Sequence, residues 1–296
     1  MKYKVIKKNI GKKNASIFST FETEKEIIDT AFEGDIGLMF IEKDNPSISI
    51  INLKGELVEN WLGKKDIVRY QNGSQTDARF TSPCSICHNG TTAYILEENA
   101  SVIRMFGLKN RYVEGFSGEQ YKIDLKKQTV KRKVLPIIKS AAYKGTVFFT
   151  NNVSNKCFCV SHGNLSYVIG DGKARFSISS EYKRSSFNRP TGIFLSGNKL
   201  YISDTNNHCI RQIDPSSNSI RIVFGNPLET NNLKHKLQNP SKLVIKRNML
   251  FVLDGNSVKV TGLASSNISA VYESDKINSI EADEYRNIYI VEREDA

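Results

Sequence analysis

The chain has 296 residues, of which 39% are hydrophobic, and it carries a formal net charge of +11. No apolar run approaches the roughly 20 residues needed to cross a bilayer, and no apolar stretch follows the N-terminal lysines, so neither a membrane span nor a secretory signal is expected. The five cysteines are an odd number, which argues against a disulfide framework and favours a reducing, cytoplasmic location.

In chain order, two short strands are expected first, at residues 3–6 and 16–21. A recurring pattern of spaced apolar residues then begins. One clear copy contains Pro83, Ile95, Glu97 and Arg104, and a second has Pro190, Ile202, Asp204 and Arg211 at the same spacings. The copies occupy residues 27–63, 80–118, 136–172, 187–225 and 239–272, and a sixth begins at 277. A repeat of roughly 40–50 residues is typical of a propeller or a solenoid.

The sixth copy is incomplete, because only four residues follow Glu292 and two outer strands are missing. The N-terminal strands can supply them and close the ring, which removes exposed sheet edges. The sequence therefore predicts one all-β domain over residues 1–296, a six-bladed β-propeller whose last blade combines 277–296 with 1–22. Residues 107–135 hold two candidate outer hairpins, so they contain an insertion or a misplaced boundary between blades.

The copy at 187–225 contains Pro190, Gly192, Asp204, Asn207, His208 and Arg211. Pro190 and Gly192 are expected to set the turn into the first strand, Asp204 to cap the following turn and His208 to pack within it. With its Pro-x-Gly-Ile start, its aromatic-Ile-x-Asp strand and its Asn-His-x-Ile-Arg ending, this stretch resembles an NHL repeat. That resemblance implies a propeller that serves as a protein-binding or RNA-binding module, with these six residues in structural roles.

The positive charge concentrates in three predicted linkers, 63–80, 172–189 and 225–239, which should lie on one face of the ring. These linkers contain eleven lysines and arginines against four acids. The predicted binding face comprises Lys64, Lys65, Arg69, Tyr70, Arg79, Lys173, Arg175, Tyr182, Lys183, Arg184, Arg189, Lys234 and Lys236. It is either an ordinary solvated surface or an electrostatic face for RNA or another polyanion. Tyr70 and Tyr182 are the candidates for base stacking, whereas Phe80, Phe176 and Phe187 are expected to anchor the linkers.

Cofactor motifs are weak. Cys84, Cys87 and His88 match a haem-attachment string, but this string falls on an innermost strand and no export signal is seen. A zinc site combining Cys84 and Cys87 with Cys157 and Cys159 is conceivable, but small buried hydrophobes are the favoured interpretation. Acids and amides at matching repeat positions could ring a channel mouth around a metal, or could each satisfy a turn: Glu42, Glu97, Asn151, Asp204, Asp254 and Glu292.

No nucleophile elbow, phosphate-binding glycine loop or H-E-x-x-H motif is present in the sequence. The expected channel positions Asp29, Cys84, Thr191, Ser241 and Asn278 are a thin ligand set for calcium. We therefore expect no cofactor and a non-catalytic scaffold that docks a protein partner, or joins an assembly, through its linkers. Single-stranded RNA binding on the same face is the first alternative, and a metal-dependent lyase or lactonase-like enzyme is the second.

Overall fold

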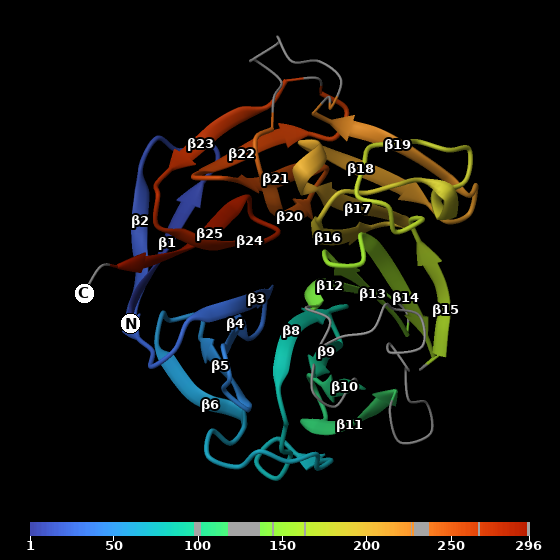
Figure 1. The fold of residues 1–296 in the computed structure, drawn as a ribbon. Coiled ribbons are helices and arrows are strands. Elements are labelled where there is room, and N and C mark those ends of the chain that lie inside the picture. Colours follow the sequence, from blue (N-terminus) through green and yellow to red (C-terminus); the bar gives the residue numbers. More distant parts are fainter. Residues whose placement is uncertain are drawn as a thin grey trace.

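The structure, a computed structural model, describes residues 1–97, 102–117, 137–143, 145–162, 164–225, 227, 237–265 and 267–294. Six β-sheets are arranged in a ring around a central axis, as Figure 1 shows. The helical elements among the described residues are two 3-10 turns, η1 (Tyr182–Arg184) and η2 (Thr205–Asn207). None of the described elements is a helix with the length and apolarity needed to span a bilayer. The all-β, six-bladed propeller predicted from the repeats is confirmed.

Each sheet is a blade of four antiparallel strands, ordered from the centre of the ring outward. The blades, innermost strand first, are as follows: β3 (Ile27–Glu33), β4 (Gly37–Glu42), β5 (Ser47–Ile51) and β6 (Leu57–Gly63); β8 (Pro83–His88), β9 (Thr92–Glu97), β10 (Val102–Gly107) and β11 (Tyr112–Ser117); β12 (Ile137–Tyr143), β13 (Thr146–Asn151), β14 (Lys156–Ser161) and β15 (Asn164–Ile169); β16 (Pro190–Ser196), β17 (Lys199–Asp204), β18 (Cys209–Asp214) and β19 (Ser219–Phe224); β20 (Pro240–Lys246), β21 (Met249–Asp254), β22 (Ser257–Gly262) and β23 (Ser269–Glu273); β24 (Ile277–Ala282), β25 (Asn287–Glu294), β1 (Lys2–Asn9) and β2 (Ala15–Glu22).

The second blade carries one addition, a short strand β7 (Gly73–Ser74) that pairs with β11 on its outer edge. Its outer hairpin is formed by β10 and β11, which pair from Phe106↔Val113 to Ile103↔Ser117. The competing hairpin in the sequence, at residues 121–132, lies outside the described residues.

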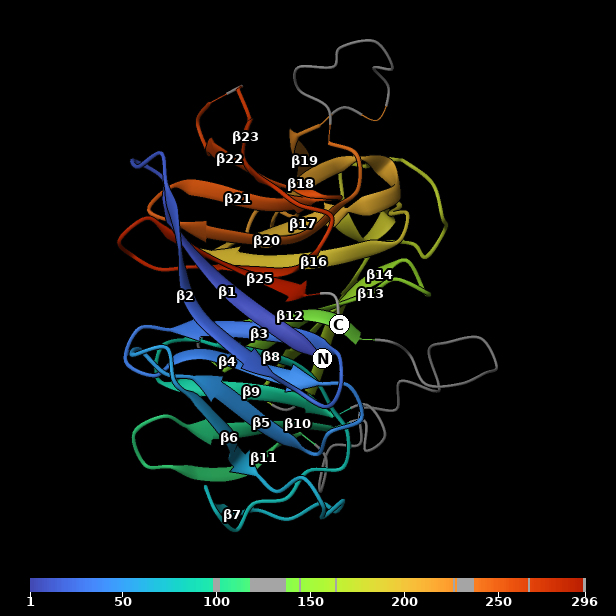
Figure 2. The ribbon, with the colours of Figure 1, turned by 90° about the vertical axis from the view of Figure 1, so that its left-hand side faces the viewer.

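The N-terminal strands complete the last blade, as the unfinished sixth repeat predicted. β1 pairs with β25 along its whole length, from Lys2↔Glu294 to Asn9↔Asn287, and β2 pairs with the other edge of β1. Figure 2 shows β1 running beside β25 on the rim of the ring. Because β24 also contacts β3, the ring of innermost strands is closed.

The apolar core is divided into six clusters, one for each interface between neighbouring blades. β9 shows how the sequence produces this arrangement. Its successive residues point to opposite faces of the sheet, so Ala93 and Ile95 pack toward the first blade, while Tyr94 and Leu96 pack toward the third. A middle strand is therefore buried on both faces, and this is why its sequence is continuously apolar instead of alternating.

The ring has two distinct faces. Linkers 63–80 and 172–189, which lead from an outermost strand to the next innermost strand, lie on one of them, here called the linker face. Turns between first and second strands lie on the opposite face, here called the turn face, at residues 33–37, 88–92, 196–199, 246–249 and 282–287. In the edge-on view of Figure 2 the turn between β24 and β25 is on the left, and the linker before β16 is on the right.

Candidate functional site

A buried arginine holds each of the two well-described linkers in place. In the second blade, Arg104 is fully buried and forms an ion pair with Glu97 at 3.0 Å. Its guanidinium also donates to the backbone oxygen atoms of Gln71 and Arg79, at 2.8 and 3.1 Å, and it lies 4.1 Å from the ring centre of Tyr70. Linker 63–80 is thereby fixed over the blade. Tyr70, predicted as an exposed stacking residue, instead stacks on this arginine.

The fourth blade repeats the arrangement with the NHL-like residues. Arg211 pairs with Asp204 at 2.5 Å, and both side chains are completely buried. Arg211 donates to the carbonyl oxygen of Ser177 at 2.8 Å and lies 4.7 Å from the ring centres of both Phe176 and Phe187. The expected anchoring role of these two phenylalanines thus agrees with their positions.

The structure corrects the expected roles of Asp204 and Gly192. Asp204 makes no side-chain cap to η2; its carboxylate accepts hydrogen bonds from the backbone N–H of Asn188 and from Asn207 Nδ2, both at 2.8 Å. Gly192 lies inside β16 and not in a turn. A Cβ at Gly192 would lie 1.9 Å from the carbonyl oxygen of Ser241 in β20, so glycine is required for the close approach of two innermost strands.

The remaining signature residues also join the repeat to its linkers. Pro190 is the first residue of β16, where a missing N–H is tolerated. Asn207 Nδ2 donates to the carbonyl oxygen of Arg175 at 3.2 Å. His208 ends η2 with a left-handed backbone, φ 54°, and its Nδ1 donates to the carbonyl oxygen of Gln238.

The six matching acids and amides bond to turns, linkers or strands next to them in the ring. Glu97 accepts from the backbone N–H of Thr81, and Asp254 accepts from those of Gln238 and Asn239. Asn151 accepts from the N–H groups of two following turn residues. Glu42 accepts a hydrogen bond from Asn45 Nδ2, and Glu292 forms an ion pair with Lys4. These hydrogen bonds agree with the turn-satisfying interpretation at five of the six positions, while Glu292 is held by a lysine of β1.

The basic residues of the linker face differ in how they are engaged. Lys65, Arg175 and Arg184 form ion pairs with Glu24, Asp171 and Glu181, while the guanidinium of Arg79 donates to nearby carbonyl oxygens. Five exposed cations make no ion pair within the described part of the chain: Lys64, Arg69, Lys173, Lys183 and Arg189. Lys234 and Lys236 lie outside the described residues.

Tyr182 is not a surface residue, contrary to its proposed role in base stacking. It is 6% exposed and packs in the cluster between the third and fourth blades, and burial raises the pKa of its hydroxyl. Aliphatic side chains that the sequence reasoning did not select are exposed instead. Val68 and Ile178 in the linkers are 67% and 47% exposed, and Val153 in the turn after β13 is 64% exposed.

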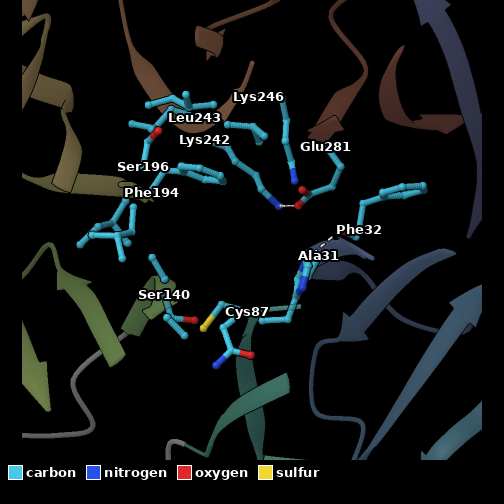
Figure 3. Close-up of a pocket in the computed structure, with 18 of the residues that line it drawn as sticks. Ala31, Phe32, Cys87, Ser140, Phe194, Ser196, Lys242, Leu243, Lys246 and Glu281 are labelled. Atoms are coloured by element: carbon cyan, nitrogen blue, oxygen red, sulfur yellow. Dashed lines mark hydrogen bonds and ion pairs between the residues drawn. The ribbon is translucent and has the colours of Figure 1, made fainter. Parts of the chain in front are cut away.

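The opposite, turn face opens into a central cavity of about 480 Å³ between the innermost strands. Phe32 and Phe194 contribute to its walls, and its mouth includes Ser196, Lys246 and Glu284. Figure 3 shows the labelled side chains around this space, with Lys242 and Glu281 meeting across adjacent blades. A volume of this size falls in the range of pockets that hold small organic molecules.

Deep in the cavity, a polar network joins the first, second, fifth and sixth blades. Lys242 Nζ donates to Glu281 Oε1, and to the carbonyl and hydroxyl oxygen atoms of Thr30 at 2.7 and 2.6 Å. Asp29 lies 3.7 Å from the same ammonium and accepts from the hydroxyl of Ser85 and the backbone N–H of Ile86. Of the expected channel positions, only Asp29 belongs to this network. Lys242, Glu281 and Thr30 were missed.

The residues of the haem-like string are accounted for by packing and hydrogen bonding. All five cysteines are free and buried, and Cys84 and Cys87 occupy a different interblade cluster from Cys157 and Cys159. Burial raises the pKa of the Cys87 thiol to about 12. His88 Nε2 donates to the carbonyl oxygen of Phe32 at 2.8 Å, and burial lowers the pKa of its ring. No group of three potential metal-ligating side chains occurs among the described residues.

The ring of six four-stranded antiparallel blades defines the chain as a β-propeller. Residues 187–213 match the model of the NHL repeat, as their resemblance to that repeat predicted, and they form part of one blade of the six-bladed ring. The chain is also similar to NHL repeat-containing protein 2 from Bos taurus, with 31% identity over an alignment of 85 residues; the match covers 25% of this chain and 12% of that protein. The match thus spans only about an eighth of that relative's length.

Solved structures share the fold at low sequence identity. The structure of a nidogen/laminin complex aligns with a TM-score of 0.60 and 14% identity, over 98% of this chain and 97% of the other. The structure of a catalytically inactive virginiamycin B lyase from Staphylococcus aureus with quinupristin aligns with a TM-score of 0.51 and 13% identity, over 98% of this chain and 99% of the other. The structure of an auxiliary nutrient binding protein from Bacteroides ovatus ATCC 8483 aligns with a TM-score of 0.56 and 9% identity, over 94% of this chain and 62% of the other. At these identities the likeness concerns the fold alone.

Proposed function

We propose that the chain is a non-catalytic binding platform whose linker face docks an acidic protein partner, alone or within a larger assembly. The observation that carries this proposal is the combination of exposed Val68, Val153 and Ile178 with cations that have no ion-pair partner among the described residues. Aliphatic side chains can anchor a protein interface, and complementary charge steers its encounter. The buried arginines support this role, because they present the linkers as fixed surfaces.

Single-stranded RNA fits this face less well. Sequence-tolerant RNA binding needs aromatic side chains on which bases stack. In the described linkers, Tyr182, Phe80 and Phe187 are buried, while Tyr70 and Phe176 are partly covered and stack on the buried arginines. The positive charge remains suitable for a polyanion, so RNA is the alternative that the experiment must separate.

An enzymatic role has less support. The matching acids satisfy their own blades, and His208 is engaged by a backbone oxygen. The likeness to a lyase is one of fold. We include a cytoplasmic location in the proposal, because five buried free thiols suit a reducing compartment.

The test is a quantitative pull-down from source-cell extract with three purified forms of the chain. The first is unmodified, the second carries Val68→Asp and Ile178→Asp, and the third carries Ile17→Asp. Ile17 is as exposed as Val68, at 67%, but lies on β2 at the outer rim, so it is a matched control. A protein recovered with the first and third forms but at least fivefold reduced with the second supports the proposal. Equal recovery with all three forms contradicts it.

A parallel anisotropy titration with labelled random single-stranded RNA separates the alternative. The informative variant reverses Lys173, Lys183 and Arg189 to Glu, since these exposed cations lack ion pairs within the described residues. Micromolar RNA binding at physiological salt that is lost in this variant, but kept with Val68→Asp and Ile178→Asp, would replace the protein-docking proposal with RNA binding.

A further inference from the structure

The central cavity has an electrostatic feature that the linker face does not explain. Its polar end holds two carboxylates, Asp29 and Glu281, against one ammonium, Lys242. The Asp29 and Glu281 side chains are 1% and 9% exposed, respectively, so little water screens their charge. Asp29 is stabilised by hydrogen bonds from Ser85 and from the N–H of Ile86, but the two carboxylates still exceed the single ammonium by one negative charge.

Lys242 has no donor left to neutralise that excess. An ammonium has three N–H groups, and those of Lys242 are directed to Glu281 Oε1, the carbonyl oxygen of Thr30 and the hydroxyl of Thr30. Thr30 Oγ1 also lies 3.0 Å from Glu281 Oε1 and 2.8 Å from Ser279 Oγ, so the network is saturated on that side.

One oxygen of the network is open. Glu281 is 7% exposed and lines the cavity, and its Oε1 is the atom that Lys242 and Thr30 contact. Its Oε2 accepts no hydrogen bond from any residue that the structure describes. Figure 3 shows Glu281 at the edge of the space enclosed by the labelled residues. A carboxylate oxygen that reaches the cavity and accepts no hydrogen bond from the described residues can accept one from a ligand bound there.

The walls and the mouth restrict what that donor can belong to. Phe194 points into the cavity, and Ala31 and Leu243 also line it, so the body of a ligand should be apolar. At the mouth, Lys246 pairs with Glu284 at 2.9 Å and Arg247 lies 4.0 Å from the same carboxylate, which leaves this end with one positive charge in excess. The cavity is therefore negative inside, apolar along its walls and positive at its opening.

We propose that this cavity binds a small molecule with a primary ammonium group on an apolar body, with the ammonium donating to Glu281 Oε2. A divalent metal is a poorer occupant, because hard cations require a cage of several oxygen ligands and no group of three ligating side chains occurs among the described residues. An anion is a poorer occupant because the donors of Lys242 are used. A carboxylate at the far end of the ligand would strengthen binding through the positive mouth.

The experiment uses the whole chain and four probes of similar length: n-hexylammonium, 6-aminohexanoate, hexanoate and 1-hexanol. Binding is measured by isothermal titration and by ligand-observed NMR. We expect hexylammonium to bind saturably in the millimolar range or tighter, at least about tenfold more strongly than hexanol, with hexanoate weakest. Tighter binding of 6-aminohexanoate than of hexylammonium would identify a zwitterionic ligand, and the reverse order would identify a simple amine; both outcomes support the ammonium site.

Two variants locate the site. Glu281→Gln should weaken hexylammonium binding about tenfold or more, because a charge-assisted hydrogen bond becomes a neutral one. Glu284→Gln, at the mouth, should change it less than about threefold. If Glu281→Gln fails to fold, as thermal unfolding would reveal, Ser196→Trp serves instead, because it fills the mouth without touching the polar network; Ser217→Trp, on an exposed turn outside the cavity, is its control.

Three results would overturn the proposal. The first is equal affinity for hexylammonium and hexanol, which would make the cavity a simple apolar pocket. The second is hexylammonium binding that survives both Glu281→Gln and Ser196→Trp unchanged. The third is the lack of saturable binding of either ammonium probe up to about 20 mM, beyond the range expected for ligands of this size.

Discussion

The buried ion pair of the fourth blade permits a sharp prediction. Replacing Arg211 with Met removes the positive charge but keeps a long apolar stem that can still pack between Phe176 and Phe187. Asp204, completely buried, is then left without its cation. Breaking a buried pair from one side costs about 3–5 kcal/mol.

The corresponding change in melting temperature follows from the size of the chain. An unfolding entropy of about 2.1 cal/mol/K per residue gives about 0.6 kcal/mol/K for 296 residues. Arg211→Met should therefore lower the midpoint of thermal unfolding by about 5–8 °C, measured by circular dichroism at neutral pH. The double variant Asp204→Asn with Arg211→Met should recover at least a third of the loss, since no unpaired charge remains buried.

Two results would refute this reasoning. A decrease below about 2 °C for Arg211→Met would mean that Asp204 finds other compensation, for example from Asn207 Nδ2 and the N–H of Asn188. A double variant no more stable than the single one would mean that the loss comes from packing and from the hydrogen bond to Ser177, and not from charge.

Three further predictions concern other parts of the ring. Gly192→Ala should lower the free energy of unfolding by about 1–3 kcal/mol in a urea titration, because its Cβ would collide with a backbone oxygen. The control Gly34→Ala should be neutral or slightly stabilising, because a Cβ there meets nothing within 4 Å. Equal effects of the two substitutions would contradict the close approach at Gly192. Burial lowers the pKa of His88, so on acidification the unfolded chain binds a proton at this histidine before the folded chain does, and stability falls as the pH drops below about 6.5. The variant His88→Asn should therefore show a smaller decrease in melting temperature between pH 8 and pH 5.5. An unchanged decrease would mean that other titratable groups cause it. Deleting residues 1–22 exposes the edge of β25, so the truncated chain should associate with increasing concentration in size-exclusion chromatography. Adding a peptide of residues 1–22 should reverse this association. A stable monomer without the peptide would show that the edge of β25 needs no cover.

Local spacing made much of the fold predictable. Each strand is marked by its own apolar residues, and copies such as 187–225 and 80–118 share the same spacing. The strands of each blade could therefore be predicted without knowing which residues they contact. The phenylalanines Phe80 and Phe187 were correctly placed in the core for the same reason. Tyr182 was not, because its neighbours Lys183 and Arg184 are polar and the residues that bury it come from other parts of two blades.

The cavity could not be assembled from the sequence in this way. Lys242 meets Thr30 across a separation of 212 residues and Glu281 across 39, and only closure of the ring creates these contacts. The expected channel positions lie two residues before each aligned apolar residue, whereas Thr30 and Lys242 stand one residue before Ala31 and Leu243. A signal was nevertheless present, since a lysine inside a predicted innermost strand is unusual.

The pairing of β1 with β25 has a consequence for how the protein is made. On the ribosome, the hairpin of β1 and β2 emerges long before its partner strand β25, which begins at Asn287. At ordinary rates of translation the two are separated by roughly a quarter of a minute to a minute. Throughout that interval, the hairpin lacks β25, and Ile6, which is buried in the finished ring against the fifth and sixth blades, lacks the residues that cover it. The nascent chain thus carries a hairpin with an uncovered apolar side chain, which chaperones would have to shield until β25 has been made.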